Sequence, residues 1–200
     1  DIVYAIVEAA EGEGGNFRTT DRGASWKKMS DHVAGSPQYY NRLFCDPKDA
    51  DKIYSMDTYA KRSDDGGATW KNMSYRDRHV DDHALWIDPD NTSHLLIGGD
   101  GGVYESFDDG KYWDFKENLP ITQLYRVSVD QSLPFYYVFG GTQDNNSMGG
   151  PTRTTVSDGV RNEDWFVTQG GDGFETQVDP QDPNLRSEER RVGKECRSRW

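Results

Sequence analysis

Short runs of mostly hydrophobic residues recur along the chain, separated by polar stretches rich in Gly and Asp. The runs at 2–7, 42–46, 52–56, 84–88 and 94–98 show this most clearly. Short runs rich in β-branched and aromatic residues are typical of strands, and the three- to four-residue period of a helix is almost absent. The sequence therefore predicts an all-β protein made of short antiparallel strands and tight turns.

A short phrase recurs three times, at residues 19–26, 63–70 and 106–113. It reads Ser or Thr, then Asp two residues later, Gly after two more, and Trp at the end. The tryptophans, Trp26, Trp70 and Trp113, are 44 and 43 residues apart. A fixed period of this length indicates a repeat architecture.

Aligning the chain on this phrase predicts a unit of four strands. The first strand ends at an Asp that is usually followed by Pro, in the stretches 42–47, 84–89, 125–130 and 175–180. Because proline has no N–H for a β-ladder, the Asp-Pro pair predicts a strand end and a turn. Second strands are expected at 52–56, 94–98 and 135–139, and fourth strands begin at the three tryptophans.

The phrase itself has a structural rationale. Its aspartates (Asp21, Asp65, Asp108) can accept hydrogen bonds from nearby backbone and hydroxyl groups, and its glycines (Gly23, Gly67, Gly110) permit a positive φ angle. Its tryptophans offer a large apolar face for packing between units. We therefore expect these residues to be scaffold rather than catalytic.

This phrase resembles the Asp-box, or BNR-like repeat, of β-propellers in the sortilin-like and xyloglucanase-like superfamily. The stretches 79–89, 98–102 and 141–145 are similar to a branch of large bacterial secreted proteins labelled glycosyl hydrolases. The resemblance implies a propeller fragment of about four four-stranded antiparallel blades with Asp-box turns. It also implies an extracellular, periplasmic or cell-envelope location.

On this basis residues 1–185 are expected to form a partial propeller. It comprises a blade end at 1–30, blades at about 38–76, 83–118 and 124–169, and the start of another blade at 174–185. The fourth repeat has the segment 140–150 in place of the phrase, and such an enlarged loop often marks a binding face.

Residues 186–200 resemble the translation of a sequencing adapter and are expected to be an artefactual tail that does not pack against the blades. The whole chain has a net charge of −12, and this tail holds six basic and three acidic residues. Without it, 17 basic and 32 acidic residues give a net charge of −15. The absence of a basic stripe argues against nucleic-acid partners and anionic membrane surfaces. Glycans, peptides or proteins remain as ligands; no cofactor is expected, although calcium stays open.

Two further composition features exclude other classes of site. No apolar run approaches the ~18 residues of a membrane-spanning helix, so no membrane insertion is expected within the chain. With Cys196 in the tail, Cys45 is the remaining cysteine, so neither a disulfide framework nor a thiolate metal site is expected. Cys45 lies in an apolar strand and is predicted to be a small core residue.

In a propeller, the loops that join strands two and three converge on one face with the loops that join successive blades. In the first set, Glu13, Asp57 and Asp100 each lie six residues before the phrase, and Asp144 continues the series. They either form a ring of carboxylates or are ordinary turn residues beside glycines.

The loops between blades carry aromatic, amide and basic side chains. His79 and His83 precede a strand, so they lack the helical spacing of a zinc site, and no metal site is predicted. His83 is a candidate general acid/base or ligand-orienting group. The candidate ligand-binding residues are Tyr40, Arg42, His83, Gln123, Tyr125, Gln143 and Asn145. The alternative role for these polar groups is hydrogen bonding between blades.

Glycoside hydrolysis requires two suitably spaced carboxyl groups. The candidates are Asp57, Asp82, Asp100, Asp144 and Asp172, and the sequence does not select a pair. Two functions therefore stay open: a sortilin-like binding or interaction module, and, as the alternative, a xyloglucanase-like glycoside hydrolase. A WD-repeat scaffold is disfavoured because no repeat carries that family's Gly-His and Trp-Asp pattern.

Overall fold

The computed structural model describes residues 1–119, 121–182, 184–189 and 196–199, and within them regular structure is almost entirely β. A single-turn 3₁₀ helix spans Asn162–Asp164. The strands are β1 (Val3–Val7), β2 (Gly15–Thr19), β3 (Lys27–Ser30), β4 (Leu43–Cys45), β5 (Ile53–Ser55), β6 (Lys61–Ser63), β7 (Lys71–Asn72), β8 (Asp82–Ile87), β9 (Leu95–Gly99), β10 (Gly102–Ser106), β11 (Asp114–Phe115), β12 (Val127–Val129), β13 (Tyr137–Gly141), β14 (Ser147–Pro151), β15 (Phe166–Gln169), β16 (Glu175–Val178), β17 (Leu185–Glu189) and β18 (Cys196–Arg199).

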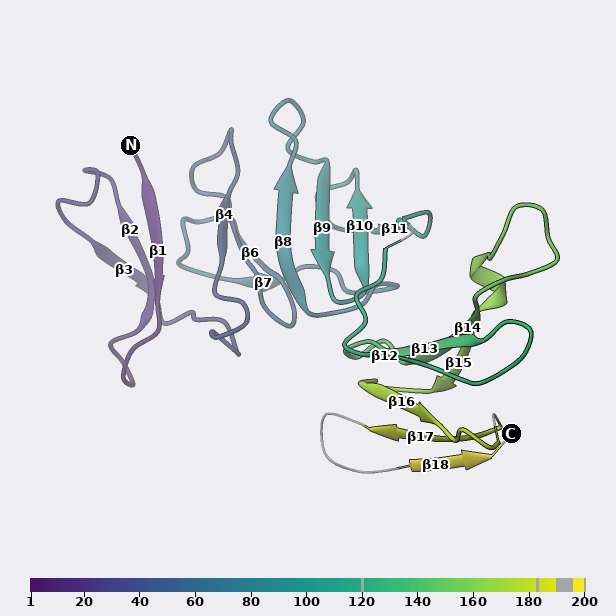
Figure 1. Cartoon of the computed structure of the whole chain (residues 1–200). Helices are drawn as coiled ribbons and strands as arrows, with labels where there is room; N and C mark the ends of the chain where they lie inside the picture. Colours follow the sequence, from purple (N-terminus) through teal and green to yellow (C-terminus); the bar gives the residue numbers. More distant parts are fainter. Residues whose placement is uncertain (120, 183, 190–195, 200) are drawn as a thin grey trace. The chain divides into compact units, whose positions relative to one another are not determined.

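These strands form separate antiparallel sheets in which each strand pairs with the next along the chain (Figure 1). The first sheet is β1-β2-β3; the second (β4–β7), third (β8–β11) and fourth (β12–β15) have four strands; the fifth is β16-β17-β18. The predicted all-β fold, a β-propeller fragment of four-stranded blades, is confirmed. The first three sheets belong to one compact unit that ends at Leu119, and the remaining two belong to a second unit.

The Asp that follows the first strand of each four-stranded unit anchors the end of that strand in two ways. The N–H groups of Asp46 and Asp88 donate to the carbonyls of Lys52 (3.0 Å) and His94 (3.1 Å), at the start of the second strand. The Asp46 carboxylate also accepts the N–H of Lys48 at 2.8 Å, which closes the turn. Asp130 and Asp179 repeat both features. The strand end predicted at these positions is confirmed, and it depends on the Asp as much as on the proline.

The repeated turn, defined as residues 19–26, 63–70 and 106–113, is closed by its aspartate. Asp65 accepts the Thr69 N–H at 2.9 Å, the Thr69 hydroxyl at 2.6 Å and the Ser63 hydroxyl at 2.8 Å. These bonds, led by that from the Thr69 hydroxyl, lower the pKa of Asp65 to about 2. Gly67 adopts a φ of 89° as predicted, and its counterparts Gly23 and Gly110 adopt 92° and 77°.

The three tryptophans of the repeated turn are buried to different degrees. Trp113 is 1% exposed, Trp70 is partly buried against His32, and Trp26 is 46% exposed. Trp113 and Trp70 each contact residues of the preceding sheet or the loop that leaves it, whereas Trp26 belongs to the first sheet. Trp70 and Trp113 are therefore packed between successive sheets, as predicted, whereas Trp26 is not.

The main core of the first unit lies between the second and third sheets. Tyr54, Met56, Leu85, Leu95 and Ile97 are its central residues, each at most 6% exposed. Burial of such side chains contributes roughly 1.5–3 kcal/mol each, which makes this seam the largest local source of stability.

A charged contact reinforces the same seam. Asp109, in the repeated turn of the third sheet, accepts from Lys52 at 2.6 Å and from Arg62 at 2.5 Å, both in the second sheet. Asp109 has a left-handed backbone (φ 66°), and so do its counterparts Arg22 (63°) and Gly66 (69°). The backbone of this turn position is thus constant while its side chain varies.

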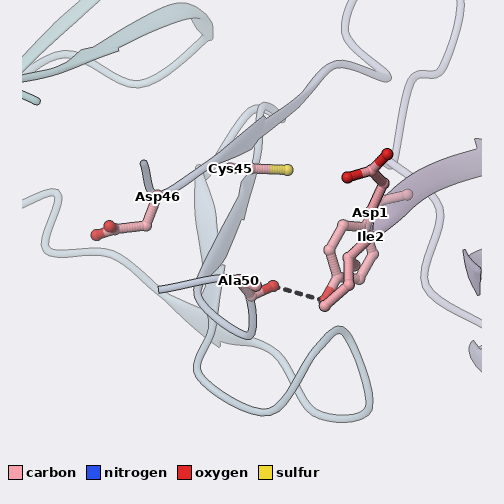
Figure 2. A pocket seen from close by; sticks show the side chains of 6 residues that line it. Asp1, Ile2, Cys45, Asp46 and Ala50 are labelled. Atoms are coloured by element: carbon pink, nitrogen blue, oxygen red, sulfur yellow. Dashed lines mark hydrogen bonds between the residues drawn. The ribbon is translucent and has the colours of Figure 1, made fainter. Parts of the chain in front are cut away.

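Cys45 is exposed, which corrects the prediction that it is a core residue. Its counterpart in the third sheet, Ile87, packs on the core between the second and third sheets. Cys45 lies beside Ile2 and Tyr4 of the first sheet, where its side chain is exposed (Figure 2).

The segment 186–200 does not behave as expected in its described part. Within β17, residues Arg186–Glu189 pair with β16, and β18 pairs with β17. The Arg186 guanidinium lies over the ring of Phe139, 4.9 Å from its centroid. The expectation that this segment makes no contact with the sheets is therefore wrong for these residues. Val192 and Trp200, whose burial the expectation also concerned, lie outside the described residues.

Candidate functional site

Four polar side chains meet at the loop end of the second and third sheets. The Tyr40 hydroxyl donates to Asp81 at 2.5 Å, and the Tyr40 ring stacks on His83 with centroids 4.9 Å apart. Nε2 of His83 lies 3.0 Å from Oδ1 of Asp100. We call Tyr40, Asp81, His83 and Asp100 the Tyr40 cluster. It joins three of the sequence-predicted site residues with one, Asp81, that was not predicted.

Backbone packing places these residues. Asp81 has a left-handed conformation (φ 67°), and its N–H donates to the carbonyl of Thr58 at 2.9 Å. Its own carbonyl accepts the N–H of Asp100 at 3.2 Å. A Cβ on Gly99 would lie 2.2 Å from that carbonyl, and one on Gly101 would lie 2.1 Å from Cβ of His79. The glycines in the segment 98–102 therefore allow the loop carrying Asp100 to approach the loop carrying Asp81.

The cluster is acidic and partly open to solvent. Carboxylate oxygens of Asp81 and Asp100 lie within 4.8 Å of each other. Burial, followed by the hydrogen bond to Asp81, raises the pKa of Tyr40 above its ordinary value, so the phenol stays protonated and donates. The side chains of His83 and Asp100 are 39% and 22% exposed, and both are therefore reachable by a ligand.

More aromatic rings lie on loops at the same end of these strands. Tyr39 is 57% exposed beside Tyr40, with ring centroids 6.4 Å apart. Tyr59 and Tyr75 form a second pair at 4.9 Å, and both rings are exposed. Exposed aromatic rings can stack on the C–H faces of sugars. Carboxylates beside them can accept hydrogen bonds from the sugar hydroxyls.

Two of the predicted catalytic acids lie in internal polar contacts. Asp82 is 2% exposed and forms a two-pronged ion pair with Arg78, with one N–O distance of 2.9 Å, and accepts the Ala60 N–H at 3.1 Å. Burial raises the pKa of Asp82, and the Arg78 guanidinium opposes that rise. Asp57 is 4% exposed and pairs with Lys61 at 2.6 Å. Both carboxylates hold loops together and face away from bulk solvent.

The remaining predicted groups of the first unit lie apart from the cluster. Nδ1 of His79 lies 2.7 Å from the carbonyl of Val80, and His83 is directed to Asp100, so the two histidines do not converge. Arg42 is exposed, and its carbonyl accepts the N–H of Met56 at 2.9 Å. Glu13 is also exposed. Within this unit the acids in register, Glu13, Asp57 and Asp100, have three different environments.

In the second unit, the segments 142–147 and 170–174 pack together. The Tyr125 hydroxyl donates to Gln143, whose carbonyl accepts from Nδ2 of Asn145 at 2.9 Å. The N–H of Asp144 donates to Oδ1 of Asp172 at 3.2 Å, which brings two candidate acids next to each other. The Tyr125 ring lies 5.2 Å from that of Phe174. Gln123 is exposed and lies outside this group of contacts.

Asp81 is the functional candidate that the sequence reasoning missed. It directly precedes Asp82, the first residue of β8, and is itself only partly buried. Because β8 has an irregular register between Asp82 and Ala84, strand alternation does not distinguish the two aspartates. No sequence signal therefore separated the accessible Asp81 from the buried Asp82.

Among the described residues, none of the helical structure has the length and apolar character needed to cross a membrane.

Comparison with known proteins gave structural similarity only. No family model and no curated protein sequence matches the chain. Among solved structures, it is similar to the GH74 enzyme of Niastella koreensis (16% identity, 94% of this chain, 31% of that one, TM-score 0.48). It is similar also to the GH74 xyloglucanase of Xanthomonas campestris (18% identity, 99% and 35% covered, TM-score 0.43) and to YCF48 bound to D1 peptide (15% identity, 93% and 72% covered, TM-score 0.40). The chain thus spans about a third of the length of the two GH74 proteins.

Proposed function

We propose that the chain is part of an Asp-box β-propeller that binds a glycan through the Tyr40 cluster and the exposed tyrosines around it. The observation that carries the proposal is the partly open stack of Tyr40 on His83, with Asp81 and Asp100 at its polar edge. Aromatic faces flanked by hydrogen-bond acceptors suit a neutral, hydroxyl-rich ligand. The net charge of −12 disfavours an anionic one. The resemblance of the repeated turn to the Asp-box supports a sortilin-like binding module that acts outside the cytoplasm.

A binding experiment with defined variants tests this proposal. The 200-residue chain is titrated with a panel of plant β-glucan oligosaccharides, and heats of binding are recorded. Tyr40→Ala and Asp100→Asn should weaken binding about tenfold or more, because each removes a contact at the centre of the site. Tyr112→Ala is the matched control, since it removes an exposed tyrosine from the repeated turn, away from the cluster. Equal affinity of all variants would refute the assignment.

Glycoside hydrolysis is the second candidate, because the Tyr40 cluster holds two neighbouring carboxylates. Asp81 and Asp100 each have a carboxylate oxygen within 4.8 Å of the other, and a retaining glycosidase requires two carboxyl groups close together. Reducing-sugar release by the unaltered chain, lost in both Asp81→Asn and Asp100→Asn, would establish the enzyme. Binding without turnover would establish the module. Asp82→Asn does not separate the two functions, because Asp82 is internal.

A further inference from the structure

The second unit contains a tyrosine whose contacts repeat those of Tyr40. Tyr40 and Tyr125 each precede the first strand of their own sheet, β4 or β12. The Tyr40 ring stacks on His83, at the start of the next sheet along the chain. The Tyr125 ring lies 5.2 Å from that of Phe174, which directly precedes β16 of the fifth sheet. The arrangement of two rings is thus present once in each unit.

The polar partner of the tyrosine differs between the two units. The Tyr40 hydroxyl donates to the carboxylate of Asp81, whereas the Tyr125 hydroxyl donates to Oε1 of Gln143. Nδ2 of Asn145 donates to the main-chain carbonyl of Gln143 at 2.9 Å, which holds a second carboxamide beside the first. A carboxylate only accepts hydrogen bonds, but a carboxamide both donates and accepts. With its oxygen engaged by Tyr125, Gln143 presents its NH₂ group as a donor.

The loop 142–147, which carries both carboxamides, is held firmly against the segment 170–174. The N–H of Asn146 donates to the Gly171 carbonyl at 2.7 Å, and Oδ1 of Asn146 accepts the Gly171 N–H at 3.0 Å. A Cβ on Gly173 would lie 2.6 Å from the Asn146 carbonyl oxygen, so glycine is needed for this close approach. The loop is therefore organised before a ligand arrives, which lowers the entropic cost of binding.

The same two segments supply a hydrogen-bond acceptor and an apolar surface. Oδ1 of Asp172 accepts the N–H of Asp144 at 3.2 Å, and a carboxylate has the capacity for further hydrogen bonds. Tyr125 is 40% exposed, and its ring is tilted by 50° from that of Phe174. Part of the aromatic surface therefore reaches solvent beside a donor and an acceptor.

The charges around this group favour an uncharged ligand. Asp144, Asp172 and Glu175 all lie on or directly beside the two segments. The guanidinium of Arg126 lies 5.6 Å from the centroid of the Phe174 ring, and its Nε is 3.6 Å from Oε2 of Glu175, which offsets its charge. An anionic ligand would meet like charges here, and such contacts are costly.

We propose that Tyr125, Gln143 and Asp172 form a second glycan site, selective for a neutral sugar that carries an acetamido group. The acetamido carbonyl accepts from the Gln143 NH₂ group, its N–H donates to the Asp172 carboxylate, and its methyl group packs on the Tyr125 ring. The Tyr40 cluster offers carboxylates at the corresponding place and lacks this match. The second site is independent of the proposed function of the Tyr40 cluster, because all its residues belong to the second unit.

Two trisaccharides with the same β-1,4 linkage test the selectivity on the full 200-residue chain. Chitotriose carries acetamido groups where cellotriose carries hydroxyl groups. Amide chemical shifts of residues 142–147, followed by NMR during titration, report this site separately from the Tyr40 cluster. Chitotriose should give saturable shifts there. The affinity for cellotriose at the same residues should be at least about tenfold lower, because it lacks the group that makes both hydrogen bonds.

Gln143→Glu supplies the matching variant. It keeps the shape of the side chain and an oxygen for the Tyr125 hydroxyl but loses the NH₂ donor, so chitotriose affinity should fall at least about tenfold. Tyr136→Ala is the control and should bind like the unaltered chain, since Tyr136 is 49% exposed and lies at the other end of β13 from Gln143. Thermal unfolding without sugar verifies that both variants are folded. Absence of saturable shifts at 142–147, equal affinity for the two sugars, or full affinity of Gln143→Glu would overturn the proposal.

Discussion

Asn16, on β2, is fully buried, and its side-chain amide has no hydrogen-bond partner among the described residues. Ala60 occupies the same repeat position in the second sheet and is also fully buried. An unsatisfied buried amide costs about 1–3 kcal/mol. Asn16→Ala should therefore raise the free energy of unfolding by about 1 kcal/mol after the loss of packing volume. Urea unfolding measures this, and a lower midpoint for the variant would contradict it.

His32 makes stability depend on pH. Its ring stacks on Trp70 at 4.3 Å, and Nε2 lies 2.9 Å from the Ser55 hydroxyl. Burial, with Lys61 nearby, lowers the pKa of His32 from 6.5 to about 4. Between these values the unfolded chain binds the proton that the folded chain excludes, so the free energy of unfolding falls as pH drops from 6.5 toward 4.

The expected size of this effect is about 1–2 kcal/mol, because part of the ring reaches solvent. His32→Gln serves as the control, and the difference between the two unfolding profiles isolates the histidine from carboxylates that titrate in the same range. Parallel profiles from pH 7 to pH 4 would show that the ring does not exclude the proton.

At the scale of the element, the three copies of the repeated turn differ in one hydrogen bond to the aspartate, and a substitution can test what that bond contributes to stability. Asp21 and Asp65 each accept a hydroxyl from the residue before the tryptophan, Ser25 or Thr69, at 2.6 Å. The third turn has Tyr112 there, which donates its backbone N–H to Asp108 at 2.9 Å but has no hydroxyl in the position of those of Ser25 and Thr69. Tyr112→Thr should add the missing bond and stabilise the protein by about 0.5–1 kcal/mol.

Tyr112→Val is the matched control for that substitution, since it has the shape of threonine without the hydroxyl. Thermal unfolding of the pair gives the value of the bond. A threonine variant no more stable than the valine variant would mean that the hydroxyl does not reach Asp108.

The elements were largely predictable from local sequence, whereas for the Tyr40 cluster the sequence indicated Tyr40, His83 and Asp100 but neither Asp81 nor the contacts among the four. Strand ends at Asp46, Asp88, Asp130 and Asp179 follow from a backbone bond and a turn that both lie within a few residues. Asp57 and Asp82 stood among the candidate acids without distinction, because their partners, Lys61 and Arg78, become apparent only when the loops fold back. The prediction for Cys45 was wrong for a related reason: whether its side chain is covered depends on the neighbouring first sheet, which the local sequence of its own strand does not reveal.

At the scale of the whole molecule, the first unit has a self-contained core. The buried cluster around Tyr54, Leu95 and Trp113 draws all its members from the second and third sheets and their loops. A fragment of residues 1–119 should therefore fold without the remainder of the chain. A dispersed amide spectrum and a cooperative thermal transition would verify this, and an unfolded fragment would show that the unit depends on later residues.

The left-handed position of the repeated turn has a consequence for how such an array can evolve. Arg22, Gly66 and Asp109 share one backbone geometry, yet only Asp109 presents a carboxylate to Lys52 and Arg62. If the first sheet were moved into the place of the third, an arginine would meet two cations. The sheets are thus similar in shape but not interchangeable in order. A newly duplicated sheet would need a substitution at the position of Asp109 before it could pack favourably against the adjacent sheet.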